Sequence, residues 1–344
     1  MEKRRLRLLV FALLLIAILG NFVPTGYVII GPGLALELDE IISVEQVVQE
    51  ERGVQEEQGD ILLTSISSRE LNPWQLIFYL LFKPDQYELV SRDLMIPQGM
   101  DIEEYIKIQE DMMLASKQNA RYIALKLAGF QPEVSGGGAK IEEVFSDSPA
   151  RNILLAGDVI TGLDGMKVHS REQLVEILRQ KQVGDEVTVE VKRGKERKTF
   201  QVKTTSLPGN PDTPALGVII SAVQPEYSFP VEVEIKTDQI IGPSAGGMFT
   251  LEILNQLTEE DITNGKRIAG TGTISLTGHL GEIGGVRQKV ITAEQHGASV
   301  FFCPEENYEQ AVQGADRIDV ISAETVFDIL EYLGHGQLNR NFAR

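Results

Sequence analysis

The sequence predicts an α+β protein of several domains, with an N-terminal transmembrane helix ahead of them. Its 344 residues exceed what one hydrophobic core usually organises, and a composition of 42% hydrophobic and 24% charged residues is close to the globular average. Residues 8–36 carry no charge, and the pattern of strands, helices and turns changes near residues 134 and 208. We therefore divide the chain into a cytoplasmic basic tail (1–7), a transmembrane anchor (8–30), an extracytoplasmic mixed segment (31–133) and two further domains (134–207 and 210–344).

The N-terminus combines a basic cluster with a long apolar run. Residues 1–7 have a net charge of +3. Because the whole chain has a net charge of −18, residues 8–344 together carry −21. The 29 uncharged residues that begin at Leu8 are enough for a spanning helix. Basic residues before such a helix stay in the cytoplasm, so we expect a single-pass protein of the cell membrane with its later domains outside the cytoplasm. A cleaved signal peptide is the alternative, although no clean small-residue cleavage site follows the run.

Residue types argue against several classes of function. The net charge of −18 disfavours nucleic acid as the main partner. The sequence has no GxxxxGK[ST] motif, so we expect no nucleotide. Its histidines form no ligand spacing, so we expect no metal and no cofactor. Cys303, the only cysteine, lies in an apolar run and is predicted to be a buried strand residue.

The mixed segment has readable local structure but no predicted chemistry. Residues 60–66 have the composition of a strand. A largely apolar helix is predicted from Asn72 onward, with Pro73 in its first turn. A second helix is predicted from Ile102 to Ala128.

Residues 134–207 follow a more specific order. A run of three glycines precedes a strand at 140–145. After this strand come SPA, AGDVI, a DG turn, a helix from Ser170 and two alternating strands. This order resembles a PDZ domain of the kind associated with bacterial proteases. The resemblance implies that a peptide adds as a strand and that amides of a glycine-rich loop hold its carboxylate. It places the peptide against Gly136, Gly137, Gly138, Ala139 and Ile141. A module that only spaces the next domain from the membrane is the alternative.

A candidate nucleophile comes after the turn at residues 207–209. A strand at 231–235 is followed by a glycine turn, Ser244 and a helical run at 248–257. Ser244 is therefore expected near a helix N-terminus, where unpaired amides such as those of Ala245 and Gly246 favour an oxyanion. Because an ordinary N-cap also looks like this, the serine needs a base to be a nucleophile.

The candidate base lies on the predicted helix at residues 286–296. At 3.6 residues per turn, Lys289 shares a face with the apolar Val290 and Ala293. Burial disfavours the ammonium form, and moving an amine pKa from about 10.4 to about 7 corresponds to roughly 4 to 5 kcal/mol. Our hypothesis is that Lys289 serves as general base for Ser244.

Three ordered motifs carry a family resemblance: GPSAG at 242–246, AGTGTISLTG at 269–278 and IGGVRQK at 283–289. They resemble the proteolytic domain of Lon proteases, over roughly residues 210–340. The resemblance implies a serine nucleophile and a lysine general base, which match Ser244 and Lys289, and a threonine that orients the lysine, which matches Thr271. It also implies a ring of six copies. Since the sequence lacks the ATPase part of Lon, we expect cleavage without ATP.

The whole order of segments resembles the membrane-anchored PDZ-Lon proteases of bacteria. The predicted function is an ATP-independent serine endopeptidase that cleaves exported peptides or unfolded protein segments. One alternative is a catalytically silent, membrane-tethered scaffold that binds peptides. A second alternative is a Ser-Asp-His hydrolase, because GPSAG also fits GxSxG; its partners would be Asp316 or Asp319, and His335.

Overall fold

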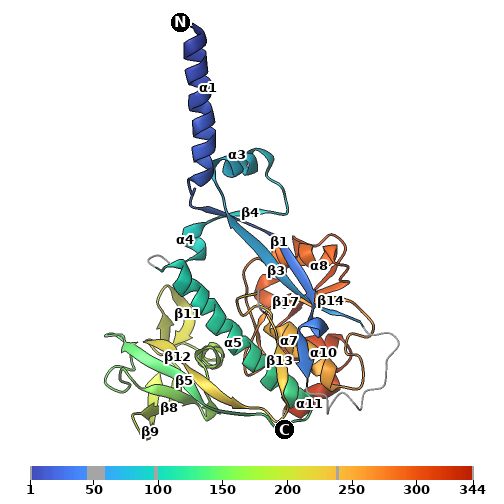
Figure 1. The fold of residues 1–344 in the computed structure, drawn as a ribbon. Helices are drawn as coiled ribbons and strands as arrows, with labels where there is room; N and C mark the ends of the chain where they lie inside the picture. Colours follow the sequence, from blue (N-terminus) through green and yellow to red (C-terminus); the bar gives the residue numbers. More distant parts are fainter. Residues whose placement is uncertain (1, 45–58, 97–99, 238–239, 343–344) are drawn as a thin grey trace. The chain divides into compact units, whose positions relative to one another are not determined.

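A computed structural model of the protein describes residues 2–44, 59–96, 100–237 and 240–342 (Figure 1). The chain forms two compact units. The first comprises Met1–Ala128, Val231–Ile274 and Gly278–Arg344, and the second comprises Gly129–Pro230 with Ser275–Thr277. The predicted separation of a mixed segment (31–133) from a C-terminal domain (210–344) is therefore wrong, because most of both belongs to the first unit.

The first unit is built on a six-stranded sheet in the order β18-β17-β14-β3-β1-β4. Its strands are β1 (Tyr27–Glu37), β3 (Ile61–Glu70), β4 (Glu88–Ser91), β14 (Ile268–Gly270), β17 (Val300–Pro304) and β18 (Asp319–Ala323). The predicted strand at 60–66 is confirmed as β3. It runs parallel to β14, with Ile61 opposite Ile268, so one sheet joins the mixed segment to the C-terminal part of the chain.

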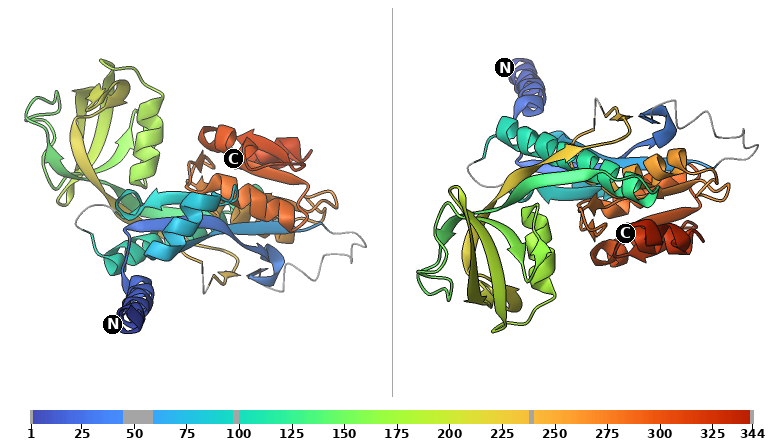
Figure 2. Two further views of the ribbon diagram at one scale, coloured as in Figure 1. Left: turned by 90° about the horizontal axis from the view of Figure 1, so that it is seen from above. Right: turned by 90° about the horizontal axis from the view of Figure 1, so that it is seen from below.

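Helices of the first unit pack against this sheet and against one another. The helix α8 (Val286–Gln295) packs on β1 and β3, and α5 (Ile102–Leu127) packs against α7 (Gly246–Leu257). The other α-helices in the described residues of this unit are α1 (Glu2–Leu19), α3 (Pro73–Phe82), α4 (Arg92–Met95), α9 (Tyr308–Val312), α10 (Val326–Tyr332) and α11 (Asn339–Phe342). Figure 2 shows the C-terminal helices, in red, beside the orange elements of the same unit. The helices predicted at 102–128, 248–257 and 286–296 are confirmed.

The core of the first unit includes the face of α8 that meets the sheet. Val286, Val290 and Ala293 are fully buried there with Phe301 and Cys303. Cys303 lies in β17 between two parallel neighbours, as predicted, and burial raises the pKa of its thiol to about 12. Short strands form two further antiparallel pairs. One is β2 (Ile42–Val44) with β13 (Val233–Ile235), and the other is β15 (Thr273–Ile274) with β16 (Leu280–Gly281).

The predicted transmembrane helix at 8–30 is wrong in its C-terminal part. The helix α1 ends at Leu19 and a 3-10 turn, η1, spans Gly20–Phe22. Tyr27 to Ile30 belong to β1, which pairs with both β3 and β4. Val28, Ile29 and Ile30 are β-branched and favour a strand, and Gly26 turns the chain just before them with φ of +71°. Among the helices of the described residues, none combines the length and apolarity needed to cross a membrane.

The second unit has one helix, a separate pair of short strands at 205–207 and 210–215, and a six-stranded sheet. Its strand order is β12-β5-β6-β8-β9, with the short β7 beside β6. The elements are β5 (Glu133–Val144), β6 (Val159–Leu163), β7 (Met166–Lys167), α6 (Arg171–Arg179), β8 (Glu186–Arg193), β9 (Glu196–Lys203), β10 (Thr205–Leu207), β11 (Asn210–Ala215) and β12 (Val218–Ser228). Apolar residues of the sheet and of α6 form a separate core, including Ile141, Ile160, Leu174 and Val189. Residues 210–230, predicted to open the C-terminal domain, instead complete this unit.

The predicted peptide-binding loop has a different position from the one expected. Gly136, Gly137 and Gly138 lie inside β5, and β12 pairs with this strand along its length. Ala139 is opposite Ala222 on one side and Ile160 on the other, and Ile141 is opposite Ile220. One edge of β5 is therefore occupied along its length by β12, and the other edge is occupied by β6 at Ala139 and Lys140.

Candidate active site

Ser244 lies in a tight loop that leads into α7. The loop turns at Gly242, whose φ is +93°, and α7 begins at Gly246 with Ala245 as its N-cap residue. The carbonyl oxygen of Ser244 accepts hydrogen bonds from the Gly272 amide at 2.8 Å and from the Thr271 hydroxyl at 2.9 Å. Two bonds to one carbonyl fix the backbone, so the half-buried serine side chain is presented from a rigid position.

Lys289 reaches Ser244 from α8. Its side chain projects from the apolar face of the helix and only 4% of the residue is exposed. The amine nitrogen Nζ is 2.7 Å from Ser244 Oγ and 2.9 Å from Thr271 Oγ1. The structure thus brings together the three side chains that the sequence singled out for the nucleophile, the base and its orienting group.

Burial sets the proton affinity of this amine. Desolvation lowers the pKa of Lys289 from 10.5 to about 7, because a charged ammonium loses its hydration in the apolar surroundings. Both close partners of Nζ are hydroxyl groups. The Thr271 hydroxyl donates its proton to the Ser244 carbonyl and therefore accepts from the amine, whereas the Ser244 hydroxyl can donate to a neutral amine or accept from an ammonium. Near neutral pH the amine can therefore take the Ser244 proton, which an ordinary lysine cannot do.

A helix that carried no predicted chemistry supports the serine loop. Ser116 of α5 is 3% exposed and its hydroxyl donates to the carbonyl oxygen of Pro243 at 2.9 Å. A side chain on Gly246 would collide with this same hydroxyl and with Ile274, so the first turn of α7 fits closely against α5. The available sequence signal was a single serine in the otherwise apolar stripe of residues 113, 116, 120 and 124.

The two amides proposed to hold an oxyanion differ in their hydrogen bonds among the described residues. The Ala245 amide makes no hydrogen bond to any residue that the structure describes. The Gly246 amide donates to the Pro243 carbonyl at 3.3 Å, and the Gly247 amide donates to Gly272 at the same distance. Ala245 is therefore the better placed donor for a negative oxygen, while Gly246 would have to release a long bond first.

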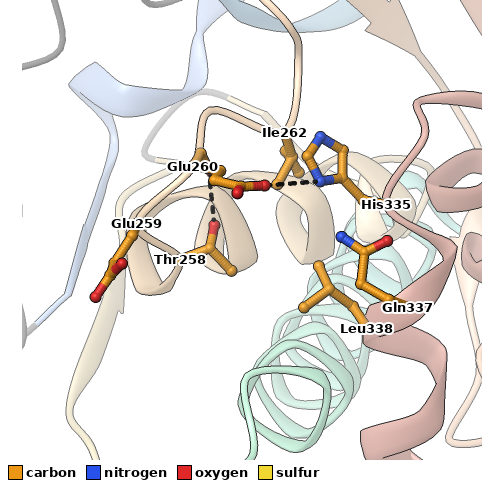
Figure 3. Close-up of a pocket in the computed structure, with 7 residues that line it drawn as sticks. All are labelled: Thr258, Glu259, Glu260, Ile262, His335, Gln337 and Leu338. Carbon is orange, nitrogen blue, oxygen red and sulfur yellow. Dashed lines mark hydrogen bonds and ion pairs between the residues drawn. The ribbon is translucent and has the colours of Figure 1, made fainter.

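The residues of the alternative catalytic triad lie elsewhere. His335 is 6% exposed and lies beside a pocket of about 280 Å³, where its Nδ1 is 3.9 Å from Glu260 Oε2 (Figure 3). Asp319 begins β18, and the Asp316 amide bonds to Glu294. The Ser244 hydroxyl contacts a lysine rather than a histidine, so this geometry does not favour a Ser-Asp-His hydrolase. Within the described ranges, no group of three His, Cys, Asp or Glu side chains is arranged to hold a metal.

Two family models match the chain, in separate regions. A PDZ domain model matches residues 127–204, and the model of the Lon protease (S16) C-terminal proteolytic domain matches residues 237–333. The second region contains Ser244, Thr271 and Lys289.

Curated relatives and a solved structure are each similar to a part of this chain. Lon protease 2 of Bacillus subtilis is 36% identical over 92 residues, which are 27% of this chain and 16% of that protein. The Lon protease of Mycoplasma mobile is 35% identical over 104 residues, which are 29% of this chain and 12% of that protein. The chain thus spans only a small share of these relatives. The crystal structure of the PDZ domain of an SdrC-like protein from Listeria innocua is 32% identical, covers 24% of this chain and 92% of that one, and has a TM-score of 0.23.

These matches agree with the order of elements and motifs along the chain. The PDZ match falls in the second structural unit except for residues 127 and 128, and the Lon match falls in the first except for residues 275–277. The chain therefore contains a PDZ domain and a Lon-type C-terminal proteolytic domain, and the latter supports a serine peptidase.

Proposed function

We propose that this protein is a serine endopeptidase that uses Ser244 and Lys289 as a catalytic dyad. The observation that supports this most is the 2.7 Å approach of a fully buried lysine amine to the serine hydroxyl. A neutral amine at this distance is a competent general base, and the lowered pKa of Lys289, about 7, keeps much of it neutral at physiological pH.

The proposed reaction follows from the contacts of these side chains. Ser244 Oγ attacks the carbonyl carbon of the scissile peptide bond, and Lys289 Nζ accepts the hydroxyl proton. The resulting oxyanion accepts a hydrogen bond from the Ala245 amide. The ammonium then gives its proton to the leaving nitrogen, so the C–N bond breaks and a serine ester remains. A water molecule, deprotonated by the same amine, hydrolyses the ester and restores Ser244.

We place peptide binding in the PDZ domain at the outer edge of β12 rather than at β5. In the described part of the sheet, β12 is the terminal strand and pairs on one side only. It follows the turn at Gly217, where φ is +68°, and it is adjacent to α6. Strand addition needs such an open edge, so this site replaces the one predicted at Gly136 to Ala139.

The remaining parts of the proposal rest on the sequence. The charge asymmetry at the N-terminus supports location at the cell membrane, with the proteolytic domain on the extracytoplasmic side. We propose exported peptides or unfolded segments as substrates, and cleavage without ATP. The ring of six copies implied by the resemblance to Lon stays a prediction.

Peptide hydrolysis by four matched proteins tests the dyad. We expect Ser244→Ala and Lys289→Ala each to lower kcat/KM by about a thousandfold or more, while His335→Ala changes it by less than about twofold. Activity that survives Lys289→Ala and is lost in His335→Ala would restore the triad. A wild type that cleaves nothing in a broad peptide library, yet binds C-terminal peptides, would favour the scaffold.

The orientation has its own measurement. Protease added to intact cells should digest residues beyond 37, because the proposal places them outside the cytoplasm. Full protection of this region, with digestion only after the cells are opened, would contradict the proposed location while leaving the dyad unaffected.

A further inference from the structure

The helix α3 has its apolar side chains on the outside. All of its ten residues except Gln75 are apolar or aromatic, and none of them is buried. Four side chains at helical spacing form an exposed stripe: Trp74 (41% exposed), Ile77 (48%), Phe78 (59%) and Leu81 (73%). Phe82, which is 66% exposed, packs against Phe78 and widens the stripe. This pattern is the reverse of an ordinary surface helix, whose apolar face turns inward.

A local framework holds α3 in this orientation. The Asn72 side chain accepts a hydrogen bond from the Gln75 amide, and the Gln75 side chain accepts one from the Asn72 amide, which together form a capping box. On the inner side, the Tyr79 hydroxyl donates to the Tyr87 carbonyl at 3.3 Å. The stripe is therefore presented by a fixed helix rather than by a loose segment.

The exposed stripe is continuous with a second apolar surface on α1. The ring of Trp74 lies directly against Gly20, so closely that a side chain on this glycine would collide with it, and Asn72 donates to the side chain of Asn21. Beyond this junction, α1 exposes a further set of large apolar side chains: Leu8, Phe11, Leu14, Leu15, Ile18 and Leu19. Figure 1 shows α3 at the C-terminal end of α1.

Charge is absent from both surfaces. In this chain 24% of residues are charged, yet residues 8–36 and 71–82 have no Asp, Glu, Lys or Arg. The basic residues Arg4, Arg5 and Arg7 are exposed at the other end of α1, and Lys83 is exposed at the C-cap of α3. A lipid bilayer matches this distribution, because its acyl region excludes charge while its headgroups accept basic and tryptophan side chains.

The apolar part of α1 is shorter than the hydrocarbon region of a bilayer is thick. The apolar part of α1, Leu8 to Leu19, is about 18 Å long at 1.5 Å per residue, against a hydrocarbon thickness of about 30 Å. We propose that α3 is an interfacial helix whose stripe of Trp74, Ile77, Phe78, Leu81 and Phe82 inserts into the outer boundary of a lipid bilayer beside α1. This inference rests on the proposed membrane location but not on the proposed peptidase activity.

Trp74 provides a direct test, because it is the only tryptophan of the chain. The full-length protein is mixed with vesicles of phosphatidylcholine and phosphatidylglycerol, and vesicle binding is measured by flotation. When part of the phosphatidylcholine carries brominated acyl chains, we expect Trp74 emission to be quenched by roughly half or more and to lose its quenching by aqueous iodide. A protein that floats with vesicles while Trp74 stays open to iodide would overturn the inference alone. A protein that does not float would overturn both the inference and the membrane location.

A probe at the far end of the stripe separates insertion of α3 from anchoring by α1. An environment-sensitive fluorophore is attached to the Leu81→Cys variant and, as a control, to Val312→Cys in α9, where the native valine is 45% exposed. Native Cys303 is fully buried and does not compete for the label. With vesicles we expect emission at position 81 to rise about threefold and emission at position 312 to stay unchanged. An increase at 81 that follows protein concentration without lipid would show a second copy of the chain on this surface, and would overturn the inference.

Charge substitutions complete the test. We expect Phe78→Glu with Leu81→Glu to weaken vesicle binding by about tenfold, because two carboxylates must enter the acyl boundary, and Val312→Glu to leave it unchanged. Hydrolysis of a soluble peptide should be the same in all three proteins, which shows that they are folded. Unaltered vesicle binding by the double variant would contradict the proposal.

Discussion

Two buried basic side chains in the first unit have nearly the same exposure and very different surroundings. Lys289 is 4% exposed and His335 is 6% exposed. Lys289 has hydroxyl oxygens at 2.7 Å and 2.9 Å, and one of them belongs to a serine at the start of a helix. His335 faces an exposed glutamate at 3.9 Å across a pocket, and its Nε2 has no hydrogen-bond partner among the described residues (Figure 3).

The difference teaches that burial alone does not make a catalytic base. Burial lowers the pKa of Lys289, and in the proposed reaction the amine acts as a base because the Ser244 and Thr271 hydroxyls lie within hydrogen-bond distance. His335 is buried to the same degree and has no nucleophile among its contacts with the described residues. Variants at the two positions should therefore separate the effect of burial on stability from the effect of side-chain contacts on activity.

The largest expected effect is the loss of activity in Lys289→Met. Methionine fills a similar volume but cannot accept a proton, so we expect kcat/KM for a peptide substrate to fall by about a thousandfold or more. Single-turnover measurements with an activated ester separate the two proton transfers, because a good leaving group needs no proton from Lys289 while attack by Ser244 still needs a base. Activity within about tenfold of the wild type on ordinary peptides would contradict the assignment of the base.

Stability should change in the opposite direction in the same variant. In the unfolded chain Lys289 keeps its proton up to about pH 10.5, whereas in the folded chain it loses the proton above about pH 7. The unfolded state binds more protons between these values, so the burial cost, on the order of 4 to 5 kcal/mol, is complete below pH 7 and disappears toward pH 10.5. We expect Lys289→Met to raise the free energy of unfolding by about 2 kcal/mol at pH 6, and by less at pH 9. Urea unfolding at the two pH values measures this, and a destabilised variant at pH 6 would contradict it.

The next largest effect is the pH dependence of the wild-type reaction. Only the neutral amine can accept the Ser244 proton, and its pKa is lowered to about 7. We therefore expect kcat/KM to rise about tenfold per pH unit below 7 and to level off above it. The His335→Leu variant should give the same curve. A midpoint that shifts in this variant would assign the titration to the histidine and reverse the comparison.

A smaller effect is expected from the hydroxyl that orients Lys289. Thr271 Oγ1 lies between the amine and the Ser244 carbonyl, at 2.9 Å from each. Thr271→Val keeps the shape and removes both bonds, so we expect kcat to fall by about tenfold to a hundredfold with little change in KM. Thr271→Ser restores the hydroxyl and should recover most of the rate. Equal activity in the valine and serine variants would show that the hydroxyl only fills space.

The local parts of this site could be predicted because adjacent residues encode them. The apolar stripe of α8 places Lys289 inward, and the glycine turn before α7 presents Ser244. The contribution of Ser116 could not be predicted, since its partner Pro243 is 127 positions away in the sequence. A serine on a helix gives no local indication of which backbone oxygen it will reach.

Long-range strand pairing limited the prediction of the fold in the same way. The composition of β3 identified a strand, but its pairing with β14 joins residues about two hundred positions apart, so the mixed segment was separated from the domain to which it belongs. Likewise, β12 pairs with β5 across the whole PDZ domain and covers the glycines that were expected to bind a peptide. Side-chain alternation predicts that a strand forms, and it does not identify the neighbouring strand.

The smallest expected effect is on the other side of the comparison, in His335→Leu. The imidazole buries a nitrogen without a hydrogen-bond partner among the described residues, and its contact with Glu260 is long and involves a largely exposed carboxylate. Replacing it with an apolar side chain removes the unpaired nitrogen as well as this weak contact, so we expect the free energy of unfolding to change by less than about 1 kcal/mol. Peptide hydrolysis should stay within about twofold of the wild type, because no step of the proposed reaction uses this residue. If this variant loses activity while remaining folded in urea titrations, the pocket beside His335 takes part in the reaction. A buried histidine beside a carboxylate would then be needed for activity without contacting the nucleophile.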